Sequence, residues 1–451
     1  MIWWTKAMRS IISSEDNDRL DLFKVFPGFR RFLASRHHYA QLRTAGDLMF
    51  VLVLVSGFFG PSEARNNMAV FLTWGILWPI IVLSWFFVGR MWCGICPFPG
   101  LGLFLQRKGF TRARPVPRFL KRYGVYLSVF LFALIIWVEI VGGLDNSPQG
   151  TSWLILTIVL GSAILGILYA GQAWCRHLCP LGRISGAAAT LAITEFRANH
   201  ERCAGCTTFA CQRGGDGKRG CPVYLGAYAV KNNLHCLVCG HCIPNCDRDS
   251  PQFLLRNPYS ELIKNKGRYI TSNYIVPFLI ASQLARFFRQ KEVFHQFARF
   301  CRSEALGFTI ILLLAYIIVL TGVRLGNRLL GHQEASLFGR FSPMVPILIP
   351  MAFSGELVYR MAYMANGLGD FVPTVGRQIN WHFLEYFTFS IPDFPIQIMS
   401  AFLMLNSSIA ACYILWRFCL EQFEGTIKLR HFIFINLLIS TFLFAYIYVI
   451  F

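Results

Sequence analysis

The sequence predicts an α-helical integral membrane protein with about eight or nine transmembrane helices and a cytoplasmic, cysteine-rich insert. Only 15% of the 451 residues are charged and 55% are hydrophobic, whereas soluble domains contain about 25% charged residues. Several apolar runs reach the length of about 20 residues that a helix needs to cross a bilayer. Twelve of the fifteen cysteines lie between Cys93 and Cys246, which marks this part of the chain as the candidate functional region.

Apolar runs define the expected membrane spans. The candidates lie at 46–60, 68–88, 124–142, 153–170, 305–322, 342–363, 394–416 and 432–451. A ninth stretch, 269–285, contains Pro277 and several polar residues. This stretch fits either a membrane span or an amphipathic helix in the interface, so both counts of helices stay open.

Basic residues set the expected orientation. The formal net charge is +20, but the chain has no nucleic-acid-binding motif and no soluble basic domain, which excludes nucleic acid as the partner. Lysine and arginine concentrate in the cytoplasmic loops of membrane proteins, beside anionic lipid. Seven of them occupy 107–122, whereas the loops 60–67 and 144–152 contain only Arg65. We therefore expect the N-terminus, this basic loop and the insert on the cytoplasmic side of a bacterial inner membrane.

The chain divides by composition into five parts. Its N-terminus is basic and polar through Arg43 without an early apolar core, so we expect no cleavable signal sequence. The expected parts are a basic cytoplasmic N-terminus at 1–45, two transmembrane hairpins at 46–199, a soluble insert at 200–250, a basic connector at 251–304 and a C-terminal transmembrane region at 305–451. The connector is expected to be either amphipathic or membrane-spanning.

The insert contains eight cysteines in the pattern of a two-cluster ferredoxin. Its second half is spaced C-x2-C-x2-C-x3-C, and its first half is stretched and ends in Cys-Pro. Such a run binds three thiolates to one [4Fe–4S] cluster and gives the fourth to the other. This rule assigns one cluster to Cys203, Cys206, Cys211 and Cys246, and the other to Cys236, Cys239, Cys242 and Cys221. A zinc site would use two close cysteine pairs, and disulfide frameworks belong to small secreted domains, so both are less favoured.

An internal repeat places four more cysteines at the ends of the two hairpins. Both hairpins end in G-x-x-W-C followed by Cys-Pro, and the gap between the cysteines differs by one residue. The four cysteines are Cys93, Cys96, Cys175 and Cys179. Because the hairpins are alike, we expect these thiols at one membrane depth. Three interpretations stay open: a shared third metal or iron–sulfur site, two redox-active dithiol pairs, and cysteines without a function.

Two transmembrane hairpins ending in W-C-x2/3-C-P, followed by a two-cluster insert, resemble the polyferredoxin-like membrane 4Fe–4S proteins of the NapH, NosR and CcoG type. The resemblance covers about residues 46–250. It implies that the four hairpin cysteines match the membrane-edge pairs of that family and the eight insert cysteines its cluster ligands. The chain departs from the pattern in its tighter first pair, in the insertion 212–220, and in Asp247 where proline is usual after Cys246. The resemblance does not extend to 305–451.

Histidines and intramembrane charges add fewer constraints. The sequence has no C-x2-C-H motif, so covalent c-type haem is not expected. His235 and His241 flank cluster ligands and are expected to tune hydrogen bonding rather than to bind metal. Glu356 and Arg360 are four residues apart, so they can pair on one helix face and are candidates for lining a quinol pocket or proton path.

These observations favour an iron–sulfur electron-transfer subunit of an inner-membrane respiratory complex. Its clusters would exchange electrons with a quinone, a haem or a periplasmic partner. Its partners would be the other subunits of the complex, cytochromes among them, together with membrane lipid. Two alternatives remain. One is a membrane copper reductase that uses the ferredoxin clusters as its electron source, and the other is a docking or assembly subunit whose C-terminal helices bind a partner complex.

Overall fold

The computed structural model describes residues 19–215, 217–264, 270–330, 342–423 and 429–450. Residues 1–18 of the expected N-terminal part lie outside the described residues. The chain forms two compact units. Unit 1 comprises Met1–Val51, Ser84–Gly124 and Leu156–Glu261, and unit 2 comprises Leu52–Leu83, Val125–Ile155 and Leu262–Phe451.

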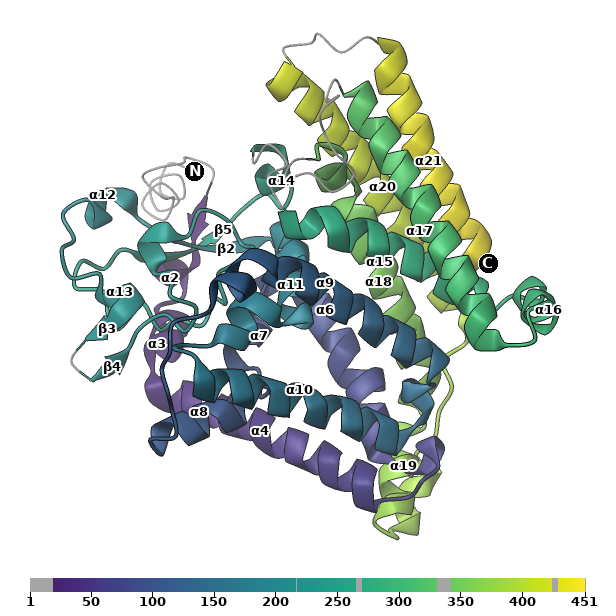
Figure 1. Cartoon of the computed structure of the whole chain (residues 1–451), viewed down its shortest axis with the longest axis horizontal. Helices are drawn as coiled ribbons and strands as arrows, with labels where there is room; N and C mark the ends of the chain where they lie inside the picture. The colour runs from purple at the N-terminus through teal and green to yellow at the C-terminus, as the bar shows by residue number, and fades with distance from the viewer. Residues whose placement is uncertain (1–18, 216, 265–269, 331–341, 424–428, 451) are drawn as a thin grey trace, which may run out of the picture. The chain divides into compact units, whose positions relative to one another are not determined.

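Eight of the described helices are long and apolar enough to cross a membrane, as the sequence predicts. They are α4 (Arg36–Phe59), the segment formed by α5 (Met68–Val70), η2 (Phe71–Leu77) and α6 (Trp78–Val88), α9 (Arg118–Val141), α10 (Pro148–Leu168), α17 (Glu304–Leu329), α18 (Met344–Leu368), α20 (Asp393–Phe423) and α21 (Leu429–Ile450) (Figure 1). Helix α4 begins before the expected residue 46 because its polar first turns are held within unit 1, where the Tyr39 hydroxyl donates to the Gly94 carbonyl. The ninth stretch forms α15 (Ile270–Phe288), which is not one of these eight.

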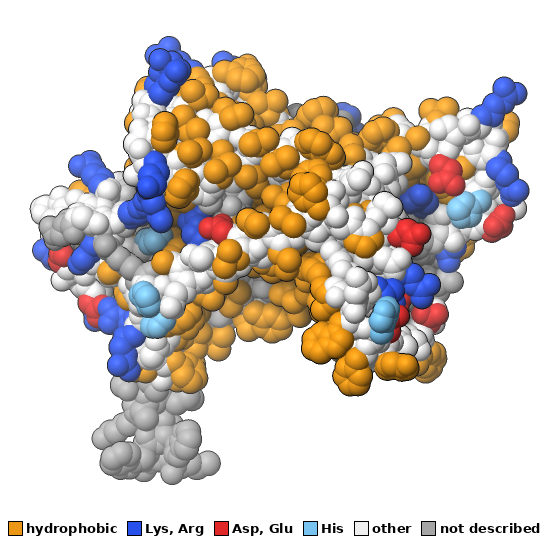
Figure 2. All heavy atoms as spheres, turned by 90° about the horizontal axis from the view of Figure 1, so that it is seen from below, with side chains coloured by type: hydrophobic (Ala, Val, Ile, Leu, Met, Phe, Trp, Pro, Cys, Tyr) orange, Lys and Arg blue, Asp and Glu red, His pale blue; other side chains and the backbone are white. Residues whose placement is uncertain are grey.

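Apolar side chains cover broad areas of the surface (Figure 2). On α17, Leu313, Leu314, Ile317 and Ile318 are exposed, as is Phe402 on α20. Soluble monomers rarely expose large apolar patches, whereas lipid tails cover such side chains in a bilayer. The exposed faces therefore fit a multi-pass membrane protein.

Unit 1 contains a three-stranded antiparallel sheet in the order β1–β5–β2 (Figure 1). Its strands are β1 (Leu20–Asp21), β5 (Pro251–Leu255) and β2 (Thr194–Ala198). Helices α2 (Leu22–Val25) and α3 (Pro27–Ala34) follow β1 and bury Phe23 and Leu33 in one core with Phe196 and Phe253. Four cysteines of the insert also pack against this core. A segment whose sequence looks like a solvated basic lead-in thus covers the cysteine-rich insert.

The cysteine motifs lie on short elements and loops rather than on the long helices. Short elements of unit 1 are α7 (Met91–Ile95), α8 (Gly100–Arg107), η4 (Trp174–Leu178), α11 (Pro180–Ala188), α12 (His200–Cys203), α13 (Ala210–Arg213), β3 (Gly214–Gly215) and β4 (Lys218–Arg219). Helices α14 (Ser260–Lys264), α16 (Glu292–Phe300) and α19 (Phe371–Gln378) follow. Short elements let the chain change direction between neighbouring thiols.

Two helices of unit 2 are buried along most of their length. Helix α15 contacts α17, α18 and α21, and α18 also contacts α20 (Figure 1). Residues Ser272–Gln283 of α15 and Met344–Val358 of α18 are buried without a break. A helix that is buried on all sides belongs to the interior of a helical protein, so α15 and α18 form the core of unit 2.

Four charged side chains of unit 2 form a continuous buried ion network. Glu356 on α18 pairs with Arg286 on α15 through one carboxylate oxygen, and its other oxygen lies 2.8 Å from Arg360 Nε. Arg360 Nη1 lies 2.7 Å from Oε1 of Glu139 on α9. Two cations balance two anions, which makes burial of the charges tolerable. The spacing in the sequence predicts the Glu356–Arg360 contact, but only the tertiary structure brings in the other two partners.

Glu139→Gln removes one anion of this network and keeps the size of the side chain. We expect the free energy of unfolding to fall by about 3–5 kcal/mol, because two buried arginines would then share one carboxylate. The matched control is Glu292→Gln, which breaks the exposed Glu292–Arg299 pair and should cost no more than about 1 kcal/mol. Denaturant titrations in detergent, followed by circular dichroism, measure both losses. Equal losses would contradict a stabilising role of the buried network.

Candidate metal centres

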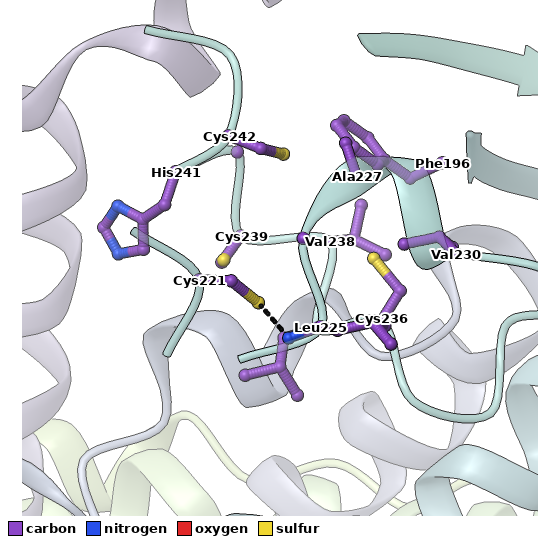
Figure 3. Close-up of a pocket in the computed structure, with 13 residues that line it drawn as sticks. Phe196, Cys221, Leu225, Ala227, Val230, Cys236, Val238, Cys239, His241 and Cys242 are labelled. Atoms are coloured by element: carbon purple, nitrogen blue, oxygen red, sulfur yellow. Dashed lines mark hydrogen bonds between the residues drawn. The ribbon is translucent and has the colours of Figure 1, made fainter. Parts of the chain in front are cut away.

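Four cysteines of unit 1 line one cavity. This central thiol group consists of Cys221, Cys236, Cys239 and Cys242. Figure 3 shows their side chains around a common space, beside Ala227 and Val238. Cys221 follows β4, whereas the other three thiols share one later loop. The backbone N–H of Leu225 donates to Cys221 Sγ at 3.4 Å.

The loop with three of these thiols turns tightly because two of its residues are left-handed. Val238 has φ 50° and Gly240 has φ 72°. A Cβ atom at Gly240 would lie 2.6 Å from the Leu33 carbonyl oxygen, so only glycine fits the turn and the close approach of α3. The turn lets the C-x2-C-x2-C run wrap around one cavity.

Burial sets the protonation of the central thiol group. It raises the pKa of Cys236 to about 11. Burial also raises the pKa of Cys239 and Cys242 well above the usual range, and the charges of neighbouring cysteines add to this effect. On their own, these thiols stay protonated at neutral pH. A bound metal centre has to displace the protons, so metal binding here releases protons.

Four further cysteines of the insert line a second pocket. This surface thiol group consists of Cys203, Cys206, Cys211 and Cys246. The Ser250 N–H donates to Cys246 Sγ at 3.3 Å, and the Ser250 hydroxyl lies 3.0 Å from Cys203 Sγ. The backbone N–H of Phe209 lowers the pKa of Cys206. Two pockets thus each contain four insert cysteines, and each set of four takes its last member, Cys221 or Cys246, from the other half of the insert.

The four hairpin cysteines lie near one another in unit 1. This membrane-edge thiol group consists of Cys93, Cys96, Cys175 and Cys179. Burial, followed by the charges of the other three, raises the pKa of Cys96. Burial and neighbouring cysteines also raise the pKa of Cys179 to about 11. The Gly182 N–H donates to Cys179 Sγ at 3.2 Å. The four thiols are therefore close enough to interact electrostatically.

Both copies of G-x-x-W-C have the same backbone conformation at their glycine. Gly89 and Gly171 have φ values of 59° and 70°, a left-handed conformation that commonly ends helices. The second copy has one more residue between its cysteines and takes it up in the π-turn η4, where Cys179 N donates to the Trp174 carbonyl at 2.8 Å. A π-turn accommodates one extra residue. The difference in spacing is therefore a local insertion, after which both copies end in Cys-Pro.

Two cations beside the membrane-edge thiol group lack carboxylate partners: Arg90, which is buried, and Arg183, which is half-buried. Among the described residues, no ion pair involves Arg90 or Arg183, and the Nε atom of each is buried without a hydrogen-bond partner. Sequence analysis did not single out these arginines. The signal that could have found them is the lack of any Asp or Glu in 66–138 and 146–194. Unpaired buried cations fit an anionic group, as a [4Fe–4S] cluster with four thiolates is.

Single metal ions and [4Fe–4S] clusters hold their thiolate ligands at different separations. Within the described ranges, no three His, Cys, Asp or Glu side chains are arranged to hold one ion. Zinc binds thiolates at about 2.3 Å, which draws their sulfurs to within about 4 Å of one another. A [4Fe–4S] cluster binds each thiolate through a different iron, so its four ligand sulfurs stand further apart.

Comparison with known proteins points to the same chemistry. A family described as a 4Fe-4S binding domain matches residues 70–114 and 151–191. The ferredoxin-type protein NapH of Haemophilus influenzae is 27% identical over 214 residues, which cover 40% of this chain and 68% of that protein. The methylamine utilization ferredoxin-type protein MauN of Methylorubrum extorquens is 30% identical over 143 residues, 28% of this chain and 48% of that protein.

A third relative is the putative electron transport protein YccM of Escherichia coli, 28% identical over 135 residues, which cover 29% of this chain and 34% of that protein. The matches therefore span half or less of the lengths of MauN and YccM. No solved structure matches this chain. The chain carries a 4Fe–4S binding domain and resembles the polyferredoxin-like, ferredoxin-type electron-transfer proteins.

Proposed function

We propose that this chain is an electron-transfer subunit of a bacterial inner-membrane redox complex, with three [4Fe–4S] clusters in unit 1. One observation carries the proposal: the match to the 4Fe–4S binding domain falls on 70–114 and 151–191, the segments that contain the membrane-edge thiol group. This group is separate from the eight cysteines of the insert, which form two further groups of four. The clusters would supply one-electron transfer at potentials that the surrounding residues set.

The three thiol groups are neighbours in a definite order. The charge of Cys211, in the surface group, contributes to the raised pKa of Cys242 in the central group. A Cβ atom at Gly94, which lies between Cys93 and Cys96, would be 3.1 Å from Cys239 Cβ. The central group therefore lies close to a thiol of the surface group and to the turn that carries Cys93 and Cys96. This order supports a path from the surface group through the central group to the membrane edge, and from there to a quinone, a haem or a periplasmic partner.

Iron content tests the number of clusters. Detergent-purified protein should contain about twelve irons and as many acid-labile sulfides per chain. Low-temperature EPR after dithionite should show three interacting clusters. A sample without iron would refute the proposed function. About eight irons, with copper bound in the same sample, would instead support the copper-reductase alternative.

Paired substitutions test the membrane-edge site. The double variant Cys93→Ala, Cys175→Ala should lose about four irons and keep the EPR signals of the two insert clusters, because it removes one ligand from each hairpin. The matched control is Cys301→Ala, which changes a cysteine at the end of α16 outside the three thiol groups and should keep full iron content. Unchanged iron in the double variant would contradict a cluster at the membrane edge.

Epitope insertion tests the proposed orientation. The exposed Gly109 lies in the basic loop after α8, with open space around it, and the positive-inside rule puts this loop in the cytoplasm. A tag inserted after Gly109 should bind antibody only in inside-out vesicles. A tag after the exposed Glu63, in the loop after α4, should bind only in right-side-out vesicles. The reverse pattern would invert the proposed topology.

A further inference from the structure

Arg90 lies between two of the thiol groups. It follows Gly89 at the end of α6 and is only 6% exposed. Its Nη1 atom donates to the carbonyl oxygen of Leu234 at 2.6 Å, two residues before Cys236 of the central group. On its other side, a Cβ atom at Gly182 would lie 3.0 Å from Arg90 Nη2 and 3.5 Å from Cys179 Sγ. The guanidinium thus binds the backbone next to the central group and shares the space around Gly182 with a sulfur of the membrane-edge group.

No carboxylate compensates this buried charge within the described part of the chain. The contact with Leu234 is the one hydrogen bond that the Arg90 side chain makes to the described residues, and its Nε has no partner. The sequence offers no acidic residue in 66–138, on either side of Arg90. Other buried arginines of unit 1 differ: Arg197 Nη2 lies 2.7 Å from Glu195 Oε2, and Arg256 pairs with Glu261. An uncompensated buried charge costs several kcal/mol, so another anion has to face Arg90.

We propose that Arg90 is the shared counter-ion of the membrane-edge and central clusters and raises the reduction potentials of both. This inference rests on the proposed function, since it requires a cluster at each of the two thiol groups. Reduction adds one negative charge to a cluster. A fixed positive charge in a region of low dielectric constant stabilises the reduced form more than the oxidised form. Arg90 would be a positioning residue that acts through charge, without binding iron.

The test is an EPR-monitored redox titration of the full chain in detergent. Arg90→Gln should move the midpoint potentials of both clusters to more negative values, whereas Arg90→Lys, which keeps the charge, should stay near the wild type. The matched control is Arg176→Gln. Arg176 is exposed and lines the same pocket as Arg90 and Cys175, so solvent screens its charge and both potentials should stay within error of the wild type.

Three results would overturn the proposal. The first is an Arg90→Gln protein with about twelve irons and unchanged potentials, and the second is a shift at one cluster alone. The third is loss of iron in both Arg90→Gln and Arg90→Lys. If Arg90→Gln alone loses iron, the proposal stands, because Arg90→Lys keeps the charge and should retain the clusters. A wild-type sample with about eight irons per chain would refute the proposed third cluster before any variant is compared. Failure of the proposed function is therefore distinguishable from failure of the proposed role of Arg90.

Discussion

The enclosure of thiols away from carboxylates is the constraint on which the rest of unit 1 depends. Thiolates are costly in an apolar surrounding unless a positive charge compensates them. Arg90 and Arg183 line a pocket with Cys175 of the membrane-edge thiol group, and the chain contains no acidic residue in 66–138 or 146–194 that could neutralise them locally. Near the sheet, by contrast, Arg197 pairs with a glutamate. Unit 1 thus contains arginines that pair with carboxylates and others that lie near thiols without a carboxylate partner among the described residues.

Duplication explains how four thiols from distant parts of the sequence reach one place. Each hairpin ends in a left-handed glycine, a turn that carries cysteine, and a Cys-Pro step. The π-turn η4 absorbs the one-residue difference between the copies. The central group then packs against the first copy at Gly94, where the absence of a side chain permits close approach to Cys239. Continuity of the three groups therefore depends on small residues and short elements more than on the long helices.

The buried charges of unit 2 are compensated in a different way. Its buried charges are balanced among themselves, because Arg286 and Arg360 face Glu356 and Glu139 across three helices. Such a network fixes the relative positions of α9, α15 and α18, because moving one helix would leave a charge unpaired in an apolar interior. In this network of unit 2 each cation faces a carboxylate, whereas Arg90 of unit 1 has no carboxylate partner among the described residues.

The membrane class and the eight candidate spans follow from the sequence alone, because the length of an apolar run is a local property of the chain. The spacing of the cysteines is local as well and predicts which of them share a cluster. Only the tertiary structure showed that Phe23 and Leu33 of the N-terminal segment cover the insert, that α15 is buried in unit 2, and that Arg90 lies between two thiol groups. These features depend on contacts between residues far apart in the chain. Neither periodicity nor spacing encodes such contacts, because packing and charge compensation are settled only when distant elements meet.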